Sequence, residues 1–491
     1  MLFNSIEFAI FLPIVFALYW LLSKNLKLQN IFVVLASYVF YAWWDWRFLG
    51  LLFGMSFISW IGGMHIYAAQ SKANASEGGG RMLFVAKSLF VTIIVLDVMV
   101  LGVFKYCNFF IGSFADLFGL HNSIHSLKIV LPLGISFFTF QAISYVVDVY
   151  KRKIEPTNMV ECLFYIGFFP KLLAGPIERP TNLIPQIQKN RVFEYDLAVD
   201  GCRQMLWGLF KKVVIADNCA LYVNQVYGDY TNQSGSTLLL AAILYTIQIY
   251  GDFSGYSDMA IGSAKLLGFR FRDNFLFPYF SRNMNEFWRR WHISLNTWFV
   301  DYVYIPLGGS RNGKWHTIRN IMIVFLLSGL WHGADWSFVA WGAYHGLLLV
   351  LLILLNRNTK YEQVVAYDKV LPSFKELAQM LLVFALATMG WILFRADNMT
   401  QAWDIITKIC SKSLLTVPWL INRFYYVPVF VYIMLCAVLE WIYRKKDFVW
   451  QDIQYNKLFR RTYVCVILYA LFFFFTIAMR GGAVDFIYFQ F

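Results

Sequence analysis

Apolar residues in this chain gather in long runs rather than alternating with polar ones. A helix needs about 20 mostly apolar residues to cross a hydrocarbon core about 30 Å thick. Runs that meet or approach this length lie near residues 5–22, 30–43, 48–67, 83–104, 129–149, 213–227, 237–250, 318–332, 335–356, 377–394, 424–443 and 462–479. The pattern predicts an all-α, polytopic integral membrane protein with roughly 11–12 transmembrane helices.

Shorter or interrupted apolar stretches complete this picture. Residues 161–175 and 201–212 contain Gly, Pro or Lys and favour re-entrant or interfacial helices. The one long polar stretch, residues 251–319, is rich in Arg and aromatic residues, which favours a segment in the interface or folded back into the protein. Since there is no linker and no internal repeat, we expect a single transmembrane domain over 1–491, with 251–319 as its interfacial or re-entrant segment.

Composition supports the membrane assignment. Hydrophobic residues make up 59% of the chain and charged residues 14%, against roughly 25% charged residues in soluble domains. The mean hydropathy is +0.55. The net charge of +13 is explained by Lys and Arg in cytoplasmic loops, so the partner that it predicts is the lipid bilayer and no nucleic acid. We expect a multi-pass protein of the cytoplasmic (inner) membrane.

Several chemical classes find no support in the sequence. The seven cysteines are scattered without a CxxC pair, which argues against a disulfide framework or a zinc site. Residues 252–258 lack the glycine and the bidentate Glu of a calcium loop, so no metal site is predicted. There is no serine-nucleophile elbow, phosphate-binding loop, dinucleotide motif or H-E-x-x-H sequence. We therefore expect no tightly bound cofactor.

His332 is the first candidate for chemistry. In a helix that begins near Arg319, it lies about 20 Å along the axis, deep in the bilayer. Gly333 is suited to end that helix, and Asp335 or Ser337 to begin the next. A break at that depth is tolerated where protein covers it or where it lines a wet cavity. The alternative is a buried histidine that a carbonyl satisfies across a helix interface.

The remaining candidates are weaker when taken alone. His292 lies in residues 285–298, where aromatic and basic residues suggest an amphipathic interfacial helix. Asp252 and Asp258 are suited to orient a basic residue or to cap a helix start. His345 has no identifiable partner in the sequence, and we expect it to serve packing.

Three motifs together resemble one family. They are residues 287–298 (FWRRWHISLNTW), 301–311 (DYVYIPLGGSR) and 330–333 (LWHG). They closely resemble the membrane-bound O-acyltransferase family, in particular its alginate O-acetyltransferase (AlgI-like) branch, which is related to the teichoic-acid D-alanyltransferases (DltB-like). Residues 249–258, 175–180 and 486–491 are similar to the same branch. One departure is Gly251, where that branch usually carries a second aromatic residue.

The resemblance implies helices around a central channel and assigns roles to the histidines. The histidine that matches His332 is the essential one inside the membrane, and the one that matches His292 is its partner on the cytoplasmic side. We expect His332 to be the general base and His292 to position the donor or to relay a proton. Supporting or channel-lining roles are expected for Trp331, Trp291, Asp335, Asp252, Asp258 and Glu178.

The resemblance also implies the reaction and its partners. An acetyl group would pass from a cytoplasmic thioester donor, acetyl-CoA or an acyl-carrier protein, towards an exported polysaccharide such as alginate. An exported SGNH-type acyltransferase would complete the modification on the outer side. Alternatives are D-alanyl transfer to teichoic acid, O-acetylation of peptidoglycan, or a transporter or scaffold of an exopolysaccharide assembly. A transporter would be expected to show internal repeats or several paired charges inside the membrane.

Overall fold

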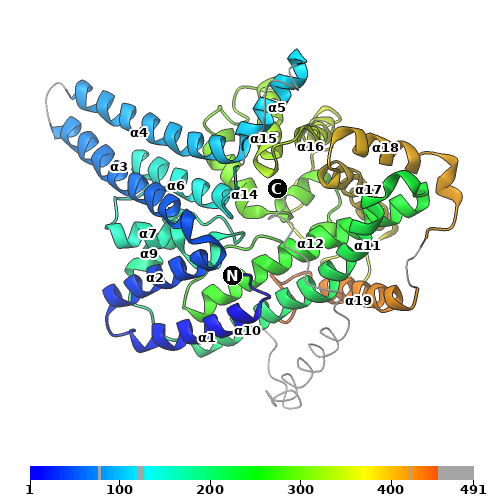
Figure 1. Ribbon diagram of the computed structural model, residues 1–491, viewed down its shortest axis with the longest axis horizontal. Coiled ribbons are helices and arrows are strands. Elements are labelled where there is room, and N and C mark those ends of the chain that lie inside the picture. The colour runs from blue at the N-terminus through cyan, green and yellow to red at the C-terminus, as the bar shows by residue number, and fades with distance from the viewer. Residues whose placement is uncertain (76–78, 120–126, 128, 420–422, 452–491) are drawn as a thin grey trace. The chain divides into compact units, whose positions relative to one another are not determined.

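The computed structural model describes residues 1–75, 79–119, 127, 129–419 and 423–451, and every regular element in these ranges is a helix (Figure 1). By its internal contacts the chain divides into two compact units. The first unit comprises residues 1–201 and 260–272, and the second comprises 202–259 and 273–491. The predicted apolar run at 462–479 lies outside the described residues.

The first two helices of the first unit begin at polar caps. The side chain of Ser5 accepts the Phe8 N–H, and that of Asn25 accepts the Leu28 N–H. Helices α3 and α4 lie side by side (Figure 1). The elements are α1 (Ile6–Leu21), α2 (Leu26–Asp45), η1 (Trp46–Phe48), α3 (Leu49–Ala75), α4 (Gly80–Leu101), η2 (Gly102–Tyr106), α5 (Cys107–Phe118), α6 (Ile135–Tyr150), α7 (Met159–Gly167), α8 (Phe169–Leu172), α9 (Pro180–Gln188) and the start of α10 (Tyr195–Phe210).

The second unit holds the rest of the helices, among them two π-helical turns. After the end of α10 its elements are η3 (Lys211–Ala216), α11 (Asp217–Gly228), η4 (Tyr230–Asn232), α12 (Gly235–Leu266, whose last turns belong to the first unit), η5 (Pro278–Phe280), α13 (Met284–Arg290), α14 (Ile293–Phe299), η6 (Val300–Tyr304), α15 (Lys314–His332), α16 (Trp336–Leu354), α17 (Phe374–Arg395), α18 (Met399–Ile409), η7 (Lys412–Leu415) and α19 (Arg423–Ile442). The π-helical turns are η3 and η6.

The all-α, polytopic prediction is confirmed. Every predicted apolar run within the described residues overlaps a helix. Five helical stretches are long and apolar enough to cross a membrane, namely Leu26–Ala75, Gly80–Phe118, Gly235–Leu266, Trp336–Leu354 and Phe374–Arg395. Shorter apolar helices cover Ile6–Leu21, Ile135–Tyr150 and Val427–Ile442. The chain is therefore a multi-pass membrane protein.

One boundary in the sequence prediction is wrong. Residues 251–266 are not part of a polar, loop-like segment, because they continue α12 as regular helix. The hydropathy pattern counts Asp252 and Asp258 as polar interruptions. In the folded chain Lys212 and Lys211 neutralise these carboxylates, so the helix carries them in its buried interior. Short helices separated by turns and loops occupy much of residues 273–313.

Helices α15 and α16 form an antiparallel hairpin whose backbones touch. A Cβ on Gly329 would overlap the carbonyl oxygen of Phe338, and a Cβ on Gly342 would overlap that of Phe325. Small residues at such positions let two helices approach more closely than side chains otherwise allow. This close approach brings His332, at the end of α15, against Trp341 in α16.

Candidate active site

The candidate site is built around the break between α15 and α16. Helix α15 ends at His332, Gly333 continues in an extended conformation, and the Asp335 side chain accepts the Ser337 N–H at 2.7 Å to begin α16. The predicted break is thus confirmed, and Asp335 acts as the helix cap. A Cβ on Gly333 would overlap the ring of Phe338, so only glycine fits this turn without displacing that ring.

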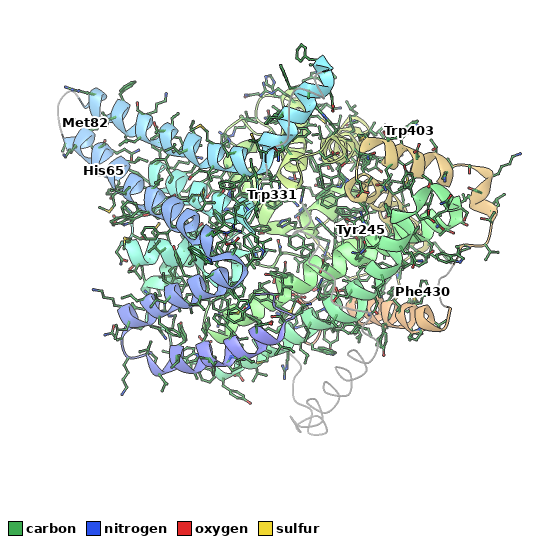
Figure 2. All side chains as sticks on the ribbon, viewed as in Figure 1. His65, Met82, Tyr245, Trp331, Trp403 and Phe430 are labelled. Atoms are coloured by element: carbon green, nitrogen blue, oxygen red, sulfur yellow. The ribbon has the colours of Figure 1, made fainter. Side chains whose placement is uncertain are left out.

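Aromatic rings surround the His332 imidazole. The rings of Trp331 and Trp341 each lie 4.9 Å from it, and that of Phe394 lies at 5.2 Å, all nearly perpendicular to the imidazole. His332 is 4% exposed. Trp331 is also buried, whereas Trp403, on α18, is exposed (both labelled in Figure 2). Such an enclosure limits the access of water and fixes the orientation of the imidazole.

His292 reaches the same place from the turn between α13 and α14. Its backbone is in the left-handed region, with φ 44° and ψ 53°, a conformation that costs a residue other than glycine about 1–2 kcal/mol. Its ring lies edge-on to that of Phe253 at 4.6 Å, and its Nδ1 is 3.0 Å from Oδ1 of Asn274. Strain held at a buried histidine is typical of functional sites.

The partners of Asn274 determine the tautomer of His292. Oδ1 of Asn274 accepts the backbone N–H of Ser294 at 3.3 Å and its hydroxyl at 2.9 Å, and Nδ2 donates to Ser257 at 3.0 Å. Because Oδ1 only accepts, Nδ1 of His292 must carry the proton, and Nε2 carries the lone pair. Burial lowers the pKa of His292 to about 3, so this imidazole is neutral at physiological pH.

The structure brings the two predicted histidines together. Their ring centroids are 6.5 Å apart, and Trp331 contacts both of them, at 5.9 Å from His292. In reactive geometries the attacking and attacked atoms lie about 3–3.5 Å apart. Two imidazoles at this separation can therefore act on the same reacting centre.

Trp291 forms the wall behind His292. Its ring stacks on Phe287, with centroids 5.6 Å apart and an interplanar angle of 17°, and contacts Trp391 at 4.8 Å. Tyr250 and Tyr279 lie on it at 6.3 and 6.0 Å. Trp291 is thus held in an aromatic cluster, and its wall-forming role stays a prediction.

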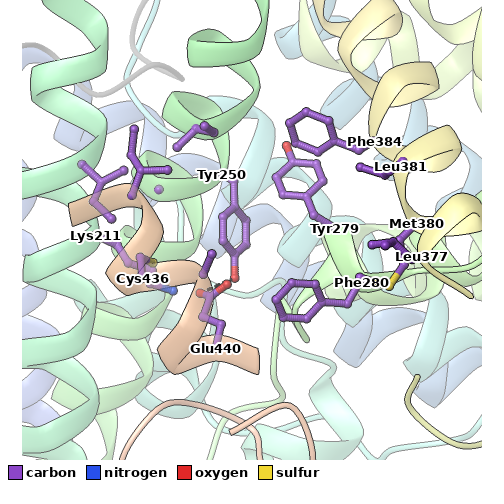
Figure 3. Close-up of a pocket in the computed structure, with 15 residues that line it drawn as sticks. Lys211, Tyr250, Tyr279, Phe280, Leu377, Met380, Leu381, Phe384, Cys436 and Glu440 are labelled. Atoms are coloured by element: carbon purple, nitrogen blue, oxygen red, sulfur yellow. Dashed lines mark hydrogen bonds between the residues drawn. The ribbon is translucent and has the colours of Figure 1, made fainter. Parts of the chain in front are cut away.

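A cavity of about 240 Å³ lies on the other side of those two tyrosines (Figure 3). Side chains of α17 and α19 supply about half of its lining, with the rest from η3, α12 and η5. The Tyr250 hydroxyl donates to Oε1 of Glu440 at 2.7 Å at its polar end. Gly251 also lines the cavity, and a Cβ there would lie 3.1 Å from the Lys211 carbonyl oxygen. The departure at Gly251 therefore belongs to the packing of α12 on η3, and neither histidine lines this cavity.

Asp252 and Asp258 support α12 through two buried lysines. Lys212 Nζ lies 2.7 Å from Asp252 and 2.9 Å from Asp217, and Lys211 Nζ lies 2.6 Å from Asp258. The expectation that these carboxylates orient basic residues is confirmed. The two lysines occupy the π-helical turn η3, and sequence reasoning did not single them out. The signal available in the sequence was a pair of lysines at the end of the interrupted apolar stretch 201–212, together with two aspartates just after the apolar run 237–250.

Glu178 belongs to the first unit and has a local role there. Its carboxylate accepts the backbone N–H of Arg272 and the side-chain amide of Asn182, both at 2.6 Å, and the residue is fully buried. It thus joins the start of α9 to the segment that follows α12.

Sequence reasoning also missed three residues that shape the histidine site. Asn274 lies in a stretch without periodic pattern, 18 residues before His292, and no local signal indicates the pairing. Trp341 and Phe394 come from α16 and α17. Pairing the two helices around the break would have indicated Trp341, whereas Phe394 requires the tertiary fold.

Comparison with known proteins identifies the family of the chain. Residues 81–366 match the model of the membrane-bound O-acyltransferase family. The chain is 40% identical over 416 residues to the probable alginate O-acetylase AlgI of Pseudomonas aeruginosa, covering 84% of this chain and 75% of the relative. It is 31% identical to the peptidoglycan O-acetyltransferase of Helicobacter pylori, over 83% of this chain and 79% of the relative.

The chain is also similar, at lower identity, to a protein that is named for the transfer of a different acyl group. It is 28% identical to the teichoic acid D-alanyltransferase of Bacillus subtilis, over 53% of this chain and 71% of that protein. Every one of these relatives is named for moving an acyl group to a polymer. The chain belongs to the membrane-bound O-acyltransferase family and is an O-acyltransferase.

Proposed function

We propose that this protein moves an acetyl group from a cytoplasmic thioester donor across the inner membrane, for O-acetylation of an exported polysaccharide. The observation that carries the proposal is the pair of buried imidazoles 6.5 Å apart at a helix break. The similarity to alginate O-acetylases over most of the chain favours acetyl as the acyl group and an alginate-like exopolysaccharide as the final acceptor.

The chemistry follows from the position of His332. The hydroxyl of an acceptor attacks a thioester slowly unless a base takes its proton in the transition state. An imidazole is suited to this task. In the proposed step His332 takes the proton, the hydroxyl oxygen bonds to the acyl carbon, and the carbon–sulfur bond breaks. The leaving thiolate then takes the proton from the imidazolium. General-base assistance contributes about 10²–10⁴-fold to such a rate.

His292 has the complementary role of orienting the donor. With the proton held on Nδ1 by Asn274, its Nε2 can only accept a hydrogen bond. Acetyl-CoA and acyl-carrier proteins both present amide N–H groups next to the thioester, and these are suitable donors to Nε2. We assign His292 to this contact, with Trp331 and Trp291 as walls of the passage.

Helix α15 separates His332 from a group of exposed basic residues. The helix begins at Lys314 and ends at His332, so it spans about 27 Å at 1.5 Å per residue. Its first turns follow exposed Arg311 and include exposed Lys314, which are suited to attract an anionic donor on the cytoplasmic side. An acetyl group delivered at His332 would then lie far from these basic residues, and an exported SGNH-type acyltransferase on the outer side is its proposed recipient.

Two alternatives within the family differ from this proposal, D-alanyl transfer in the acyl group and peptidoglycan O-acetylation in the acceptor. D-alanyl transfer and peptidoglycan O-acetylation use related proteins. The buried pairs Lys211–Asp258 and Lys212–Asp252 satisfy the expectation of paired charges for a transporter. Since each pair is closed by direct contact within the protein, we assign these charges to the stability of α12 and not to a transport path.

The donor and the direction can be tested in membrane vesicles. Inside-out vesicles that contain the protein, given acetyl-CoA with a labelled acetyl group on the outside, are expected to transfer label to an acceptor in the lumen. Right-side-out vesicles are the control and should transfer none. Mass spectrometry of the polymer from intact cells should find added acetyl, whereas added alanyl would contradict the proposal.

A further inference from the structure

His345 is a buried histidine that the proposed reaction does not use. It lies in α16, is 0% exposed, and neither ring nitrogen has a hydrogen-bond partner in the part of the chain that the structure describes. The sequence favoured a packing role for it. A packing role alone would be better served by an apolar side chain, because a buried polar atom without a partner costs about 1–3 kcal/mol.

The surroundings of His345 are shaped for its ring. The rings of Trp288, Trp341 and Tyr344 lie 4.9, 5.1 and 5.1 Å from it. A Cβ on Gly390 would overlap its Nε2, so α17 carries a glycine where the imidazole meets it. The imidazole therefore has a fixed place between α13, α16 and α17.

Two of these neighbours carry donors that match the lone pair of an imidazole. Within the described residues, the indole N–H groups of Trp288 and Trp341 are also buried without a hydrogen-bond partner. A neutral imidazole has one accepting nitrogen, and an indole N–H only donates. Unsatisfied groups of complementary type at one place are suited to a shared hydrogen bond, made directly or through one bound water molecule.

Trp341 connects this cluster to the reacting centre. Its ring contacts His345 at 5.1 Å and His332 at 4.9 Å, in both cases nearly edge to face. It also stacks on Trp391, with an interplanar angle of 26°. Any rotation of the Trp341 indole changes the surface against which His332 is oriented.

We propose that His345 is a positioning residue for acyl transfer. Its imidazole accepts a hydrogen bond from the Trp341 indole N–H, directly or through one water molecule, and so holds that ring against His332. This inference rests on the proposed function, because it concerns the orientation of the proposed general base. It predicts that the hydrogen-bonding capacity at position 345, and not the volume of the side chain, determines the rate.

The test compares two replacements of His345 with a matched neighbour. His345→Phe keeps an aromatic ring and removes hydrogen bonding, whereas His345→Gln keeps an acceptor. Tyr344→Phe removes a hydroxyl that donates to the Leu386 carbonyl at 2.9 Å, next to the same ring. Each variant is expressed in cells that lack the protein, together with wild type and His332→Ala, and polymer-bound acetyl and the melting temperature of the purified protein are measured.

We expect His345→Phe to lose activity without loss of stability, and Tyr344→Phe to lose stability without loss of activity. His345→Phe should melt no lower than wild type and yield at least about tenfold less acetyl per unit of protein, in the range seen when groups that orient a reacting ligand are lost. His345→Gln should retain most of the acetyl. Tyr344→Phe should melt lower and retain the acetyl.

Several results would overturn the inference. These are wild-type acetyl in His345→Phe, or equal losses in the Phe and Gln variants at an unchanged melting temperature. If His345→Phe does not fold, His345→Leu replaces it, and failure of both to fold would show that the imidazole is needed for folding only. Absence of acetyl with wild type would instead contradict the proposed function, which keeps the two failures distinct.

Discussion

Two buried polar clusters of the second unit differ in how their charges are treated. In the lysine–aspartate cluster (Lys211, Lys212, Asp217, Asp252 and Asp258), each lysine lies within 2.6–2.9 Å of a carboxylate. In the histidine site (His292 and His332), the imidazoles lie among aromatic rings, 6.5 Å apart, and an amide holds His292. In the first cluster each lysine is paired with a carboxylate, while in the second the imidazole of His292 is neutral at physiological pH.

This difference indicates that the two clusters have different roles, one in stability and the other in catalysis. A buried ion pair adds little net stability, but removal of one partner leaves an uncompensated charge and is costly. The lysine–aspartate cluster should therefore respond to substitution by unfolding. The imidazole of His292 is neutral at physiological pH, so substitution in the histidine site should reduce catalysis more than stability.

The substitution Lys212→Met is the strongest test of the difference between the two clusters. This change leaves Asp252 and Asp217 buried without their cation, and we expect a loss of about 3–5 kcal/mol in the free energy of unfolding. Denaturant unfolding in detergent micelles measures it. The control Lys265→Met affects a partly exposed pair with Asp200 and should cost about 1 kcal/mol or less. Equal losses in the two variants would contradict the assignment.

Loss of the group that orients His292 should separate activity from stability. Asn274→Leu removes the acceptor for Nδ1 of His292, so the tautomer is no longer fixed. We expect about 10–100-fold less acetyl transfer, the range seen when groups that orient reacting ligands are removed. Ser294→Ala removes one donor to the same amide and should retain most activity. Transfer at the wild-type rate in Asn274→Leu would refute the orienting role.

The glycine at the helix break offers a smaller structural effect. Gly333→Ala places a Cβ on the Phe338 ring, and overpacking of this kind costs about 1–3 kcal/mol. The shift should also displace His332 and lower transfer. Gly228→Ala is the control, since no atom lies within 4 Å of its added Cβ. Unchanged melting temperature and activity in Gly333→Ala would show that the turn tolerates a side chain.

The smallest expected effect is a dependence of stability on pH. The pKa of His292 is lowered to about 3 in the folded protein, against about 6.5 in an unfolded chain. Below pH 6.5 the unfolded state gains a proton that the folded state does not, so stability present above pH 6.5 is lost as the pH falls. Between pH 6.5 and 5.5 the loss is about 1 kcal/mol.

The variant His292→Gln checks this dependence. Its melting temperature should fall less than that of wild type between pH 6.5 and 5.5, while His65→Gln, at an exposed position, should behave as wild type does. Equal falls for wild type and His292→Gln would contradict a buried neutral imidazole.

Much of the fold can be predicted from the sequence, because long apolar runs directly indicate membrane-spanning helices. The break at Gly333 and the capping by Asp335 were predicted from residue types alone. The prediction failed at residues 251–266, where hydropathy cannot show that Asp252 and Asp258 meet lysines from another helix. Pairing between distant segments is a tertiary property, and single-residue hydropathy contains no information on it.

The site was accessible only in part for the same reason. His332 and His292 stand out by their motifs, and the structure brings them together. Asn274, Trp341 and Phe394 complete the site from segments whose sequences contain no local signal for it. His345 was assigned to packing because the sequence could not show that buried indole N–H groups surround it.

The most direct test of the account is polymer-bound acetyl in cells that lack this protein, complemented with wild type or with His332→Ala at equal membrane levels. The account predicts that wild type restores acetyl and that the variant yields about 10²–10⁴-fold less, with a melting temperature close to that of wild type. Restoration of acetyl by His332→Ala would contradict the assignment of His332 as the general base.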